Sequence, residues 1–219
     1  MIFRDRAEAG RRLADRLTAF RGRDDVVVLA LPRGGLPVGR EVANAIGAPL
    51  DVMLVRKLGY PGQEELAMGA IASGGVRMIN QEVVDLLGVT EHTLAAVAAT
   101  EQVELERRER EYRGDRPAAE LAGRIVILVD DGLATGSSMQ AAVEAVRAQS
   151  PARVIVAVPV APAETCERFR TIVDDVICLE TPEPFHAVGL WYEDFSQVSD
   201  SDVRAILADS RPPPPPATD

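Results

Sequence analysis

The sequence predicts an α/β fold, with a doubly wound, mostly parallel sheet that has helices on both faces, plus a helical insertion and a small C-terminal hood. Two observations lead to this prediction. Several short runs of consecutive apolar residues, bounded by turn-forming or charged residues, have the length of strands buried on both faces. Helical patterns separate most of these runs, and parallel strands need such crossover connections.

Each element follows from its own pattern. The first 17 residues predict an amphipathic helix, because charged residues interrupt the apolar ones too often for a signal peptide. Continuous apolar runs predict strands over residues 26–31, 50–55, 125–129, 154–158 and 176–179. Helical spacing or composition predicts helices over residues 36–46, 137–149 and 163–170. Ligands of such sheets bind beyond the carboxyl ends of strands, so the loops after residues 31, 55 and 129 are where we search for a site.

Three segments fall outside this alternation. Residues 80–118 are rich in alanine, glutamate and arginine and predict a helical insertion, either solvated surface helices or a substrate lid or dimer arm. Residues 180–200 are expected to form the hood of a single domain over residues 1–210. The proline-rich residues 211–219 predict an extended, disordered tail.

Composition narrows the class of protein. The 219 residues are 47% hydrophobic, enough for a core, and their net charge of −10 argues against a broad nucleic-acid or anionic-membrane surface. No apolar run reaches the roughly 18 residues of a membrane span. Two cysteines and two histidines exclude a disulfide framework and histidine-rich zinc chemistry. We therefore expect a cytoplasmic protein without nucleic-acid or membrane partners.

The most informative segment is IVILVDDGLATGSSM, residues 125–139. A buried strand ends in Asp130 and Asp131, and a short loop with glycines and hydroxyl side chains leads into a helix. Glycine lets backbone N–H groups point into one concavity, and a helix N-terminus adds free donors, so this loop predicts a phosphate site. Its spacing fits neither a Walker A loop nor a dinucleotide fingerprint.

The two acids indicate more than a bare phosphate. Carboxylates beside a phosphate repel it unless they bind hydroxyl groups or a metal ion, and a ribose 5-phosphate meets this condition. An Asp-Asp-Gly turn followed by helix-capping hydroxyls is the purely structural alternative.

The segment VILVDDGLATGSSM resembles the phosphoribosyl-pyrophosphate signature of the type I phosphoribosyltransferases, and with neighbouring loops the resemblance covers about two thirds of the chain. It implies that Asp130 and Asp131 bind the ribose hydroxyls and take part in holding a Mg²⁺ cofactor. The 5-phosphate site that it implies consists of Gly132, Leu133, Ala134, Thr135, Gly136, Ser137 and Ser138.

Two further loops resemble the pyrophosphate side of that family. Pro-Arg-Gly-Gly after the first strand offers Arg33 to phosphate oxygens and Gly34 to a close turn, with a plain turn as the alternative. Arg56 and Lys57, the sole lysine, follow the second expected strand. The resemblance implies that this basic pair faces pyrophosphate, and mere surface charge is the alternative.

Residues 58–67 resemble the mobile loop that closes over the reacting centre in the family, and an exposed hairpin is the alternative. Ala134 stands where the hypoxanthine–guanine type has its catalytic aspartate, so Glu64 or Glu65 is the expected general base.

The hood leaves the acceptor open. By resemblance to the hypoxanthine–guanine type, His186 stacks on the base and Glu193 approaches the metal. Pro159, however, stands where that type has a purine-reading lysine.

The resemblance implies a Mg²⁺-dependent enzyme, expected to act as a homodimer, that moves phosphoribose from phosphoribosyl pyrophosphate to a nucleobase-like acceptor. A non-catalytic regulator that binds a phosphoribosyl ligand or nucleotide in the same pocket is the alternative. A phosphatase or kinase-like domain fits less well, because the chain has no P-loop lysine.

Overall fold

The computed structural model describes residues 2–210, apart from the side chains of residues 64 and 65. The tail predicted over residues 211–219 therefore lies outside the described residues. No helix in the described part of the chain is both long and apolar enough to cross a bilayer.

A five-stranded parallel sheet forms the centre of the molecule, in the order β2-β1-β6-β7-β8. Its strands are β1 Val26–Ala30, β2 Leu50–Val52, β6 Ile125–Val129, β7 Arg153–Val160 and β8 Asp175–Glu180. The apolar runs form buried strands because both faces of the sheet are covered, which confirms the predicted fold class.

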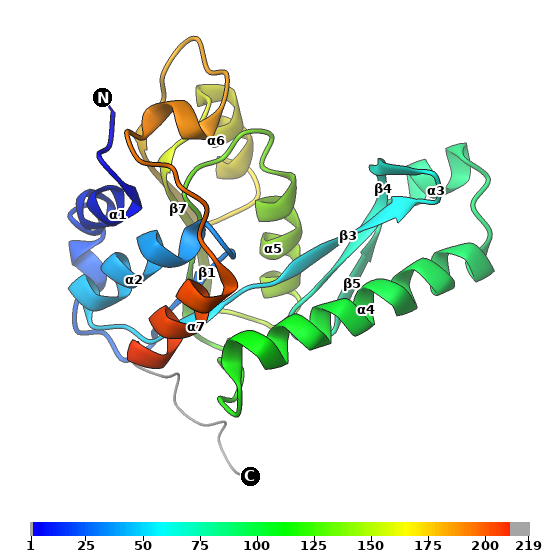
Figure 1. The fold of residues 1–219 in the computed structure, drawn as a ribbon, viewed down its shortest axis with the longest axis horizontal. Coiled ribbons are helices and arrows are strands. Elements are labelled where there is room, and N and C mark those ends of the chain that lie inside the picture. Colours follow the sequence, from blue (N-terminus) through cyan, green and yellow to red (C-terminus); the bar gives the residue numbers. More distant parts are fainter. Residues whose placement is uncertain (1, 211–219) are drawn as a thin grey trace.

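Helices cover the two faces of this sheet in two groups (Figure 1). Alternate side chains of a strand point to opposite faces, so Val28 packs with one group and Leu29 with the other. The first group is α1 Arg6–Ala14, α2 Gly35–Ile46 and α7 Asp200–Asp209. The second group is α5 Ser137–Arg147 and α6 Ala163–Arg170.

A second, antiparallel sheet extends away from the first, with strands β3 Val55–Tyr60, β4 Gln63–Ala72 and β5 Val76–Ile79. The helices α3 Gln81–Leu86 and α4 Glu91–Arg113 follow it, and α4 runs alongside β3 (Figure 1). The main core includes Leu94, Ala98, Leu105 and Tyr112 of α4, so the helix expected to be solvated is buried along one side.

The expected strand over residues 50–55 is wrong in its extent. Pairing with β1 ends at Val52, and Val55 already pairs with Ala72 in the small sheet. Arg56 and Lys57 therefore lie within β3 and do not follow a strand of the main sheet. Residues 58–67 form a hairpin whose turn has Pro61 and a positive-φ Gly62, as a tight turn with Pro-Gly at its centre requires.

The expected hood contains the short 3₁₀ helix η2 Val188–Trp191, and Phe3 pairs with Tyr192 beside it. Another short 3₁₀ helix, η1 Thr18–Phe20, follows α1. The helix α7 was not predicted, although the sequence at its beginning carries a capping signal. Ser199 and Asp202 form a reciprocal capping box there.

Candidate functional site

The end of β6 carries the acidic pair, and the loop that follows leads directly into α5. Gly136 immediately precedes the helix with φ of 73°, a conformation that favours glycine. The helix begins at Ser137 without a side-chain cap among the described residues. Its first backbone N–H groups are thus available to an anion, and the helix dipole adds a partial positive charge.

Neighbouring elements hold this loop in place. The backbone N–H of Leu133 donates to the Val160 carbonyl of β7 at 2.9 Å. From α6, the Thr165 hydroxyl donates to the Ala134 carbonyl at 3.0 Å, and Arg168 donates to the Thr135 carbonyl. These two hydrogen bonds from α6 hold the loop in place and do not depend on a ligand.

Asp130 borders a cavity of about 130 Å³, which we call the arginine cavity. Its polar lining consists of Arg33, Arg56, Arg108, Tyr112, Asp130 and Ser138. The apolar lining comes from the residues that directly follow β1 and β2 and from the first residue of β3. Four predicted site residues thus line the same cavity: Asp130, Ser138, Arg33 and Arg56.

Asp131 faces a different set of groups. Its Oδ2 accepts a hydrogen bond from Nε of Arg6 at 2.8 Å, and the two side chains are 14% and 11% exposed. A Cβ on Gly34 would come within 2.0 Å of the same oxygen, so glycine is needed there for close packing. The Tyr192 hydroxyl donates to the Asp131 carbonyl at 2.5 Å.

Burial governs the protonation of both acids. It raises the pKa of Asp130, and the adjacent charge of Asp131 raises it further. Burial also raises the pKa of Asp131, while the Arg6 guanidinium opposes that shift. A ligand group that compensates the Asp130 charge, whether a hydroxyl donor or a cation, therefore binds favourably at this site.

Among residues 2–210, leaving out the side chains of residues 64 and 65, no group of three or more His, Cys, Asp and Glu side chains is placed to hold a metal ion. A cation bound at Asp130 would need further oxygens from water or substrate. Mg²⁺ typically binds in this manner, so the Asp130 carboxylate at the edge of this cavity fits that ion.

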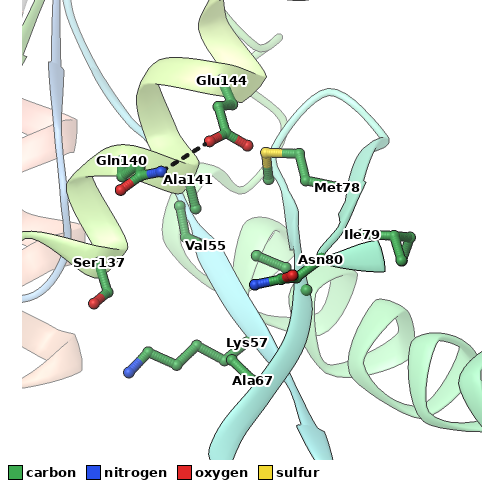
Figure 2. Close-up of a pocket in the computed structure, with 12 residues that line it drawn as sticks. Val55, Lys57, Ala67, Met78, Ile79, Asn80, Ser137, Gln140, Ala141 and Glu144 are labelled. Atoms are coloured by element: carbon green, nitrogen blue, oxygen red, sulfur yellow. Dashed lines mark hydrogen bonds between the residues drawn. The ribbon is translucent and has the colours of Figure 1, made fainter. Parts of the chain in front are cut away.

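The structure places Lys57 apart from the cavity that Arg33 and Arg56 share. Arg33 lies 3.8 Å from Asp200 of α7, and Arg56 pairs with Glu101 of α4 at 2.5 Å. Exposed Lys57 borders a neighbouring cavity of about 330 Å³ between the small sheet and α5, which Ser137 also lines (Figure 2).

Other predicted residues lie further from these contacts. His186 and Glu193 are exposed, and His186 precedes η2 in the hood. The backbone of Glu64 belongs to β4, and its side chain lies outside the described part of the chain.

Sequence reasoning missed three residues of this region: Arg6, Arg108 and Tyr112. Arg108 and Tyr112 are four positions apart, which places them on one side of α4. That spacing gave a signal for a shared face but none for what the face contacts.

Comparison with known proteins supports the fold class of the chain. The family model described as "Phosphoribosyl transferase domain" matches residues 4–193. Two Mycobacterium tuberculosis proteins, Rv0571c and MT0597, carry names that propose a phosphoribosyl transferase activity. Each is 47% identical over 206 residues. The match covers 94% of this chain and 46% of each relative, so the chain spans about half their length.

A solved structure is also similar over almost the whole chain. The protein TT1426 from Thermus thermophilus has 45% sequence identity and a TM-score of 0.85. The match covers 96% of this chain and 99% of TT1426.

Proposed function

The chain belongs to the phosphoribosyl transferase domain family, and on that premise we propose that it transfers phosphoribose from phosphoribosyl pyrophosphate to a nitrogenous base. One observation carries the proposal: the Asp130 carboxylate, the start of α5 and Arg33 border one small cavity. A sugar that carries both a 5-phosphate and a diphosphate needs donors at both ends and an acceptor for its hydroxyls between them.

Each group has a part in this assignment. The α5 N-terminus and Ser138 bind the 5-phosphate, and Asp130 accepts a ribose hydroxyl. Asp131, whose Oδ2 already accepts a hydrogen bond from Arg6, accepts a second ribose hydroxyl. Mg²⁺, held by Asp130 together with substrate oxygens, would neutralise charge on the diphosphate.

The transfer itself is a displacement at the anomeric carbon. A nitrogen of the base forms a bond to that carbon, and the bond to the diphosphate oxygen breaks with its electron pair leaving on diphosphate. The nitrogen loses its proton to a general base, and Glu64 stays the proposed group. The chain contributes positioning and preorganised positive charge, which usually dominate such reactions.

The experiment is a nucleobase screen with phosphoribosyl pyrophosphate and Mg²⁺ that follows pyrophosphate release. We expect release with at least one base, and loss of release and of sugar-phosphate binding in Asp130→Asn/Asp131→Asn. The chain provides a matched control in Asp24→Asn/Asp25→Asn, a second adjacent acid pair that precedes β1 at the opposite end of the sheet. Normal sugar-phosphate binding by the first double variant would refute the role of the acids.

A regulator on the same fold is the second candidate, because Pro159 stands where the hypoxanthine–guanine type has its purine-reading lysine. Such a protein would bind phosphoribosyl pyrophosphate yet release no pyrophosphate with any base. A homodimer and a cytoplasmic location stay predictions, and sedimentation of the purified protein tests the first.

A further inference from the structure

The helix α4 contributes side chains to the arginine cavity. Arg108 and Tyr112 line it together with Arg33, Arg56 and Asp130. These residues come from distant parts of the chain, since α4 enters the sequence between the small sheet and β6. The cavity is therefore complete only when α4 is docked.

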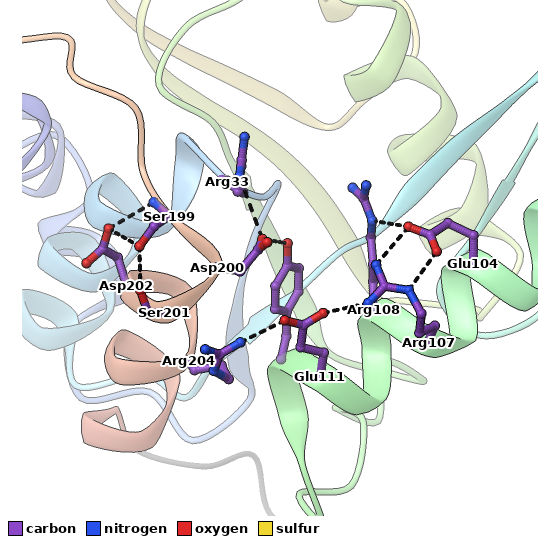
Figure 3. A network of polar contacts seen from close by, with 11 residues as sticks. Arg33, Glu104, Arg107, Arg108, Glu111, Ser199, Asp200, Ser201, Asp202 and Arg204 are labelled. Atoms are coloured by element: carbon purple, nitrogen blue, oxygen red, sulfur yellow. Dashed lines mark hydrogen bonds and ion pairs between the residues drawn. The ribbon is translucent and has the colours of Figure 1, made fainter.

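Acidic partners outside the cavity lining hold its arginines. Arg56 pairs with Glu101, and Nε of Arg108 donates to Glu104 at 2.7 Å. Asp200 lies 3.8 Å from Arg33 and accepts a hydrogen bond of 2.5 Å from the Tyr112 hydroxyl. Figure 3 shows Asp200 beside Arg33, and Arg107 and Arg108 converging on Glu104.

The charge of the lining points to an anion with several oxygens. Three arginines and one carboxylate border about 130 Å³ of space, in a chain with net charge −10. A guanidinium group can bind phosphate oxygens through two parallel hydrogen bonds. The acidic partners already hold the arginine side chains in place, so these side chains lose less conformational entropy when an anion binds. The cavity is also large enough for several water molecules, and so for a phosphate group.

We propose that α4 completes the diphosphate subsite, with Arg108 binding the diphosphate beside Arg33 and Arg56. Tyr112 acts as a positioning residue, because its hydroxyl holds Asp200, which in turn faces Arg33. This inference rests on the proposed function and extends it, since it turns the helical insertion into part of the substrate site.

The test compares two adjacent arginines of α4. Arg108→Gln removes a guanidinium from the cavity, whereas Arg107→Gln removes one that also pairs with Glu104 but is 55% exposed and does not line the cavity. Calorimetry measures the binding of phosphoribosyl pyrophosphate and of ribose 5-phosphate, which lacks the diphosphate, with Mg²⁺ present.

We expect Arg108→Gln to weaken phosphoribosyl pyrophosphate binding about tenfold or more, as the loss of a charge-assisted hydrogen bond implies. Ribose 5-phosphate binding should stay unchanged, and Arg107→Gln should match the wild type with both ligands. Arg108→Lys should recover part of the loss, because it keeps the charge without the planar fork.

The outcomes separate this inference from the proposed function. If the wild type binds phosphoribosyl pyrophosphate and Arg108→Gln binds it equally well, α4 has no part in the subsite and only this inference falls. An equal loss with both ligands would also overturn it, since the effect would then not concern the diphosphate. If the wild type binds neither ligand, the proposed function itself fails.

Discussion

Asp130 is a carboxylate whose ionised form the fold disfavours. Burial and the neighbouring charge of Asp131 raise its pKa, while its Oδ1 accepts only the backbone N–H of Asp131 at 2.8 Å among the hydrogen bonds of the described residues. A group kept in such a setting is typical of binding sites, where ligand contacts supply the missing compensation. Its neighbour differs, because Arg6 already compensates Asp131.

Asp130→Asn should therefore stabilise the free protein at pH 7 by about 1 kcal/mol, because it removes a buried charge. The pKa of Asp130 is higher in the folded state than in the unfolded state, so ionisation costs more in the folded state. The wild type therefore loses stability as the pH rises from the unfolded-state pKa to the folded-state pKa. The gain should thus disappear below about pH 3.9, where the carboxyl is protonated in both states.

Denaturant unfolding at several pH values measures this difference, with Asp24→Asn as an exposed control. A gain that did not vary with pH would contradict the assigned cause. Binding of ribose 5-phosphate should weaken in the same variant, which would separate stability from function at one residue.

Arg6 and Asp131 form a pair that should show strong energetic coupling. Arg6→Gln leaves a largely buried carboxylate without its cation and removes the guanidinium stacked 3.8 Å from the Phe195 ring centre. We expect a loss of about 3 kcal/mol in unfolding free energy. Adding Asp131→Asn should restore about 1 kcal/mol or more.

A double-mutant cycle measured by denaturant unfolding tests this coupling. Arg4→Gln provides the control, because Arg4 is 65% exposed and pairs only with its neighbour Asp5 among the ion pairs of the described residues. Additive effects of the Arg6 and Asp131 substitutions would show that the pair is not coupled.

At the scale of elements, the start of α5 depends on Gly136. Both Gly136 and Gly47 have left-handed backbone, with φ of 73° and 75°. A Cβ on Gly136 would also come within 2.6 Å of the Phe169 ring, whereas one on Gly47 would meet nothing within 4 Å. An alanine would therefore meet the same backbone strain at both positions but a steric clash only at Gly136.

Gly47→Ala should cost about 1 kcal/mol of stability through its backbone alone. Gly136→Ala should cost about 1 kcal/mol more through the clash and should weaken ribose 5-phosphate binding, since the loop would shift. Unfolding and calorimetry on both variants check this, and equal effects would contradict it.

Elements with a local signal could be predicted from the sequence, and others could not. The β6–loop–α5 unit was predicted nearly as it stands, because its apolar run, acids and glycines are contiguous. The second sheet was not predicted, although the pair Gly74-Gly75 between β4 and β5 is a turn signal in the sequence. Both glycines have positive φ in the structure. The end of β2 at Val52 could not be predicted, since it depends on where β1 stops pairing.

At the scale of the whole molecule, one ion pair connects α4 to the main sheet. Arg113 at the end of α4 donates to Asp51 of β2 at 2.8 Å, and the side chains are 9% and 4% exposed. Arg113 also donates to the Val52 carbonyl at 2.8 Å. Such pairing across 62 positions is invisible in the sequence, which is why the cavity role of Arg108 and Tyr112 escaped prediction.

Arg113→Leu should reduce the unfolding free energy by about 3 kcal/mol, because it leaves the Asp51 carboxylate buried and unpaired. Arg110→Leu, one turn earlier on the same helix and 71% exposed, should change it by less than about 0.5 kcal/mol. Thermal and denaturant unfolding compare the two. Equal losses would mean that the helix, and not its tie to the sheet, determines the effect.

Lys57 has a practical consequence for studying the protein. It is the only lysine among the 219 residues, and it borders the cavities on both sides of β3. A reagent that acylates amines will therefore label one side chain, and that side chain lines both cavities. The rate of that labelling, followed by absorbance or mass spectrometry, then reports whether a ligand occupies either cavity.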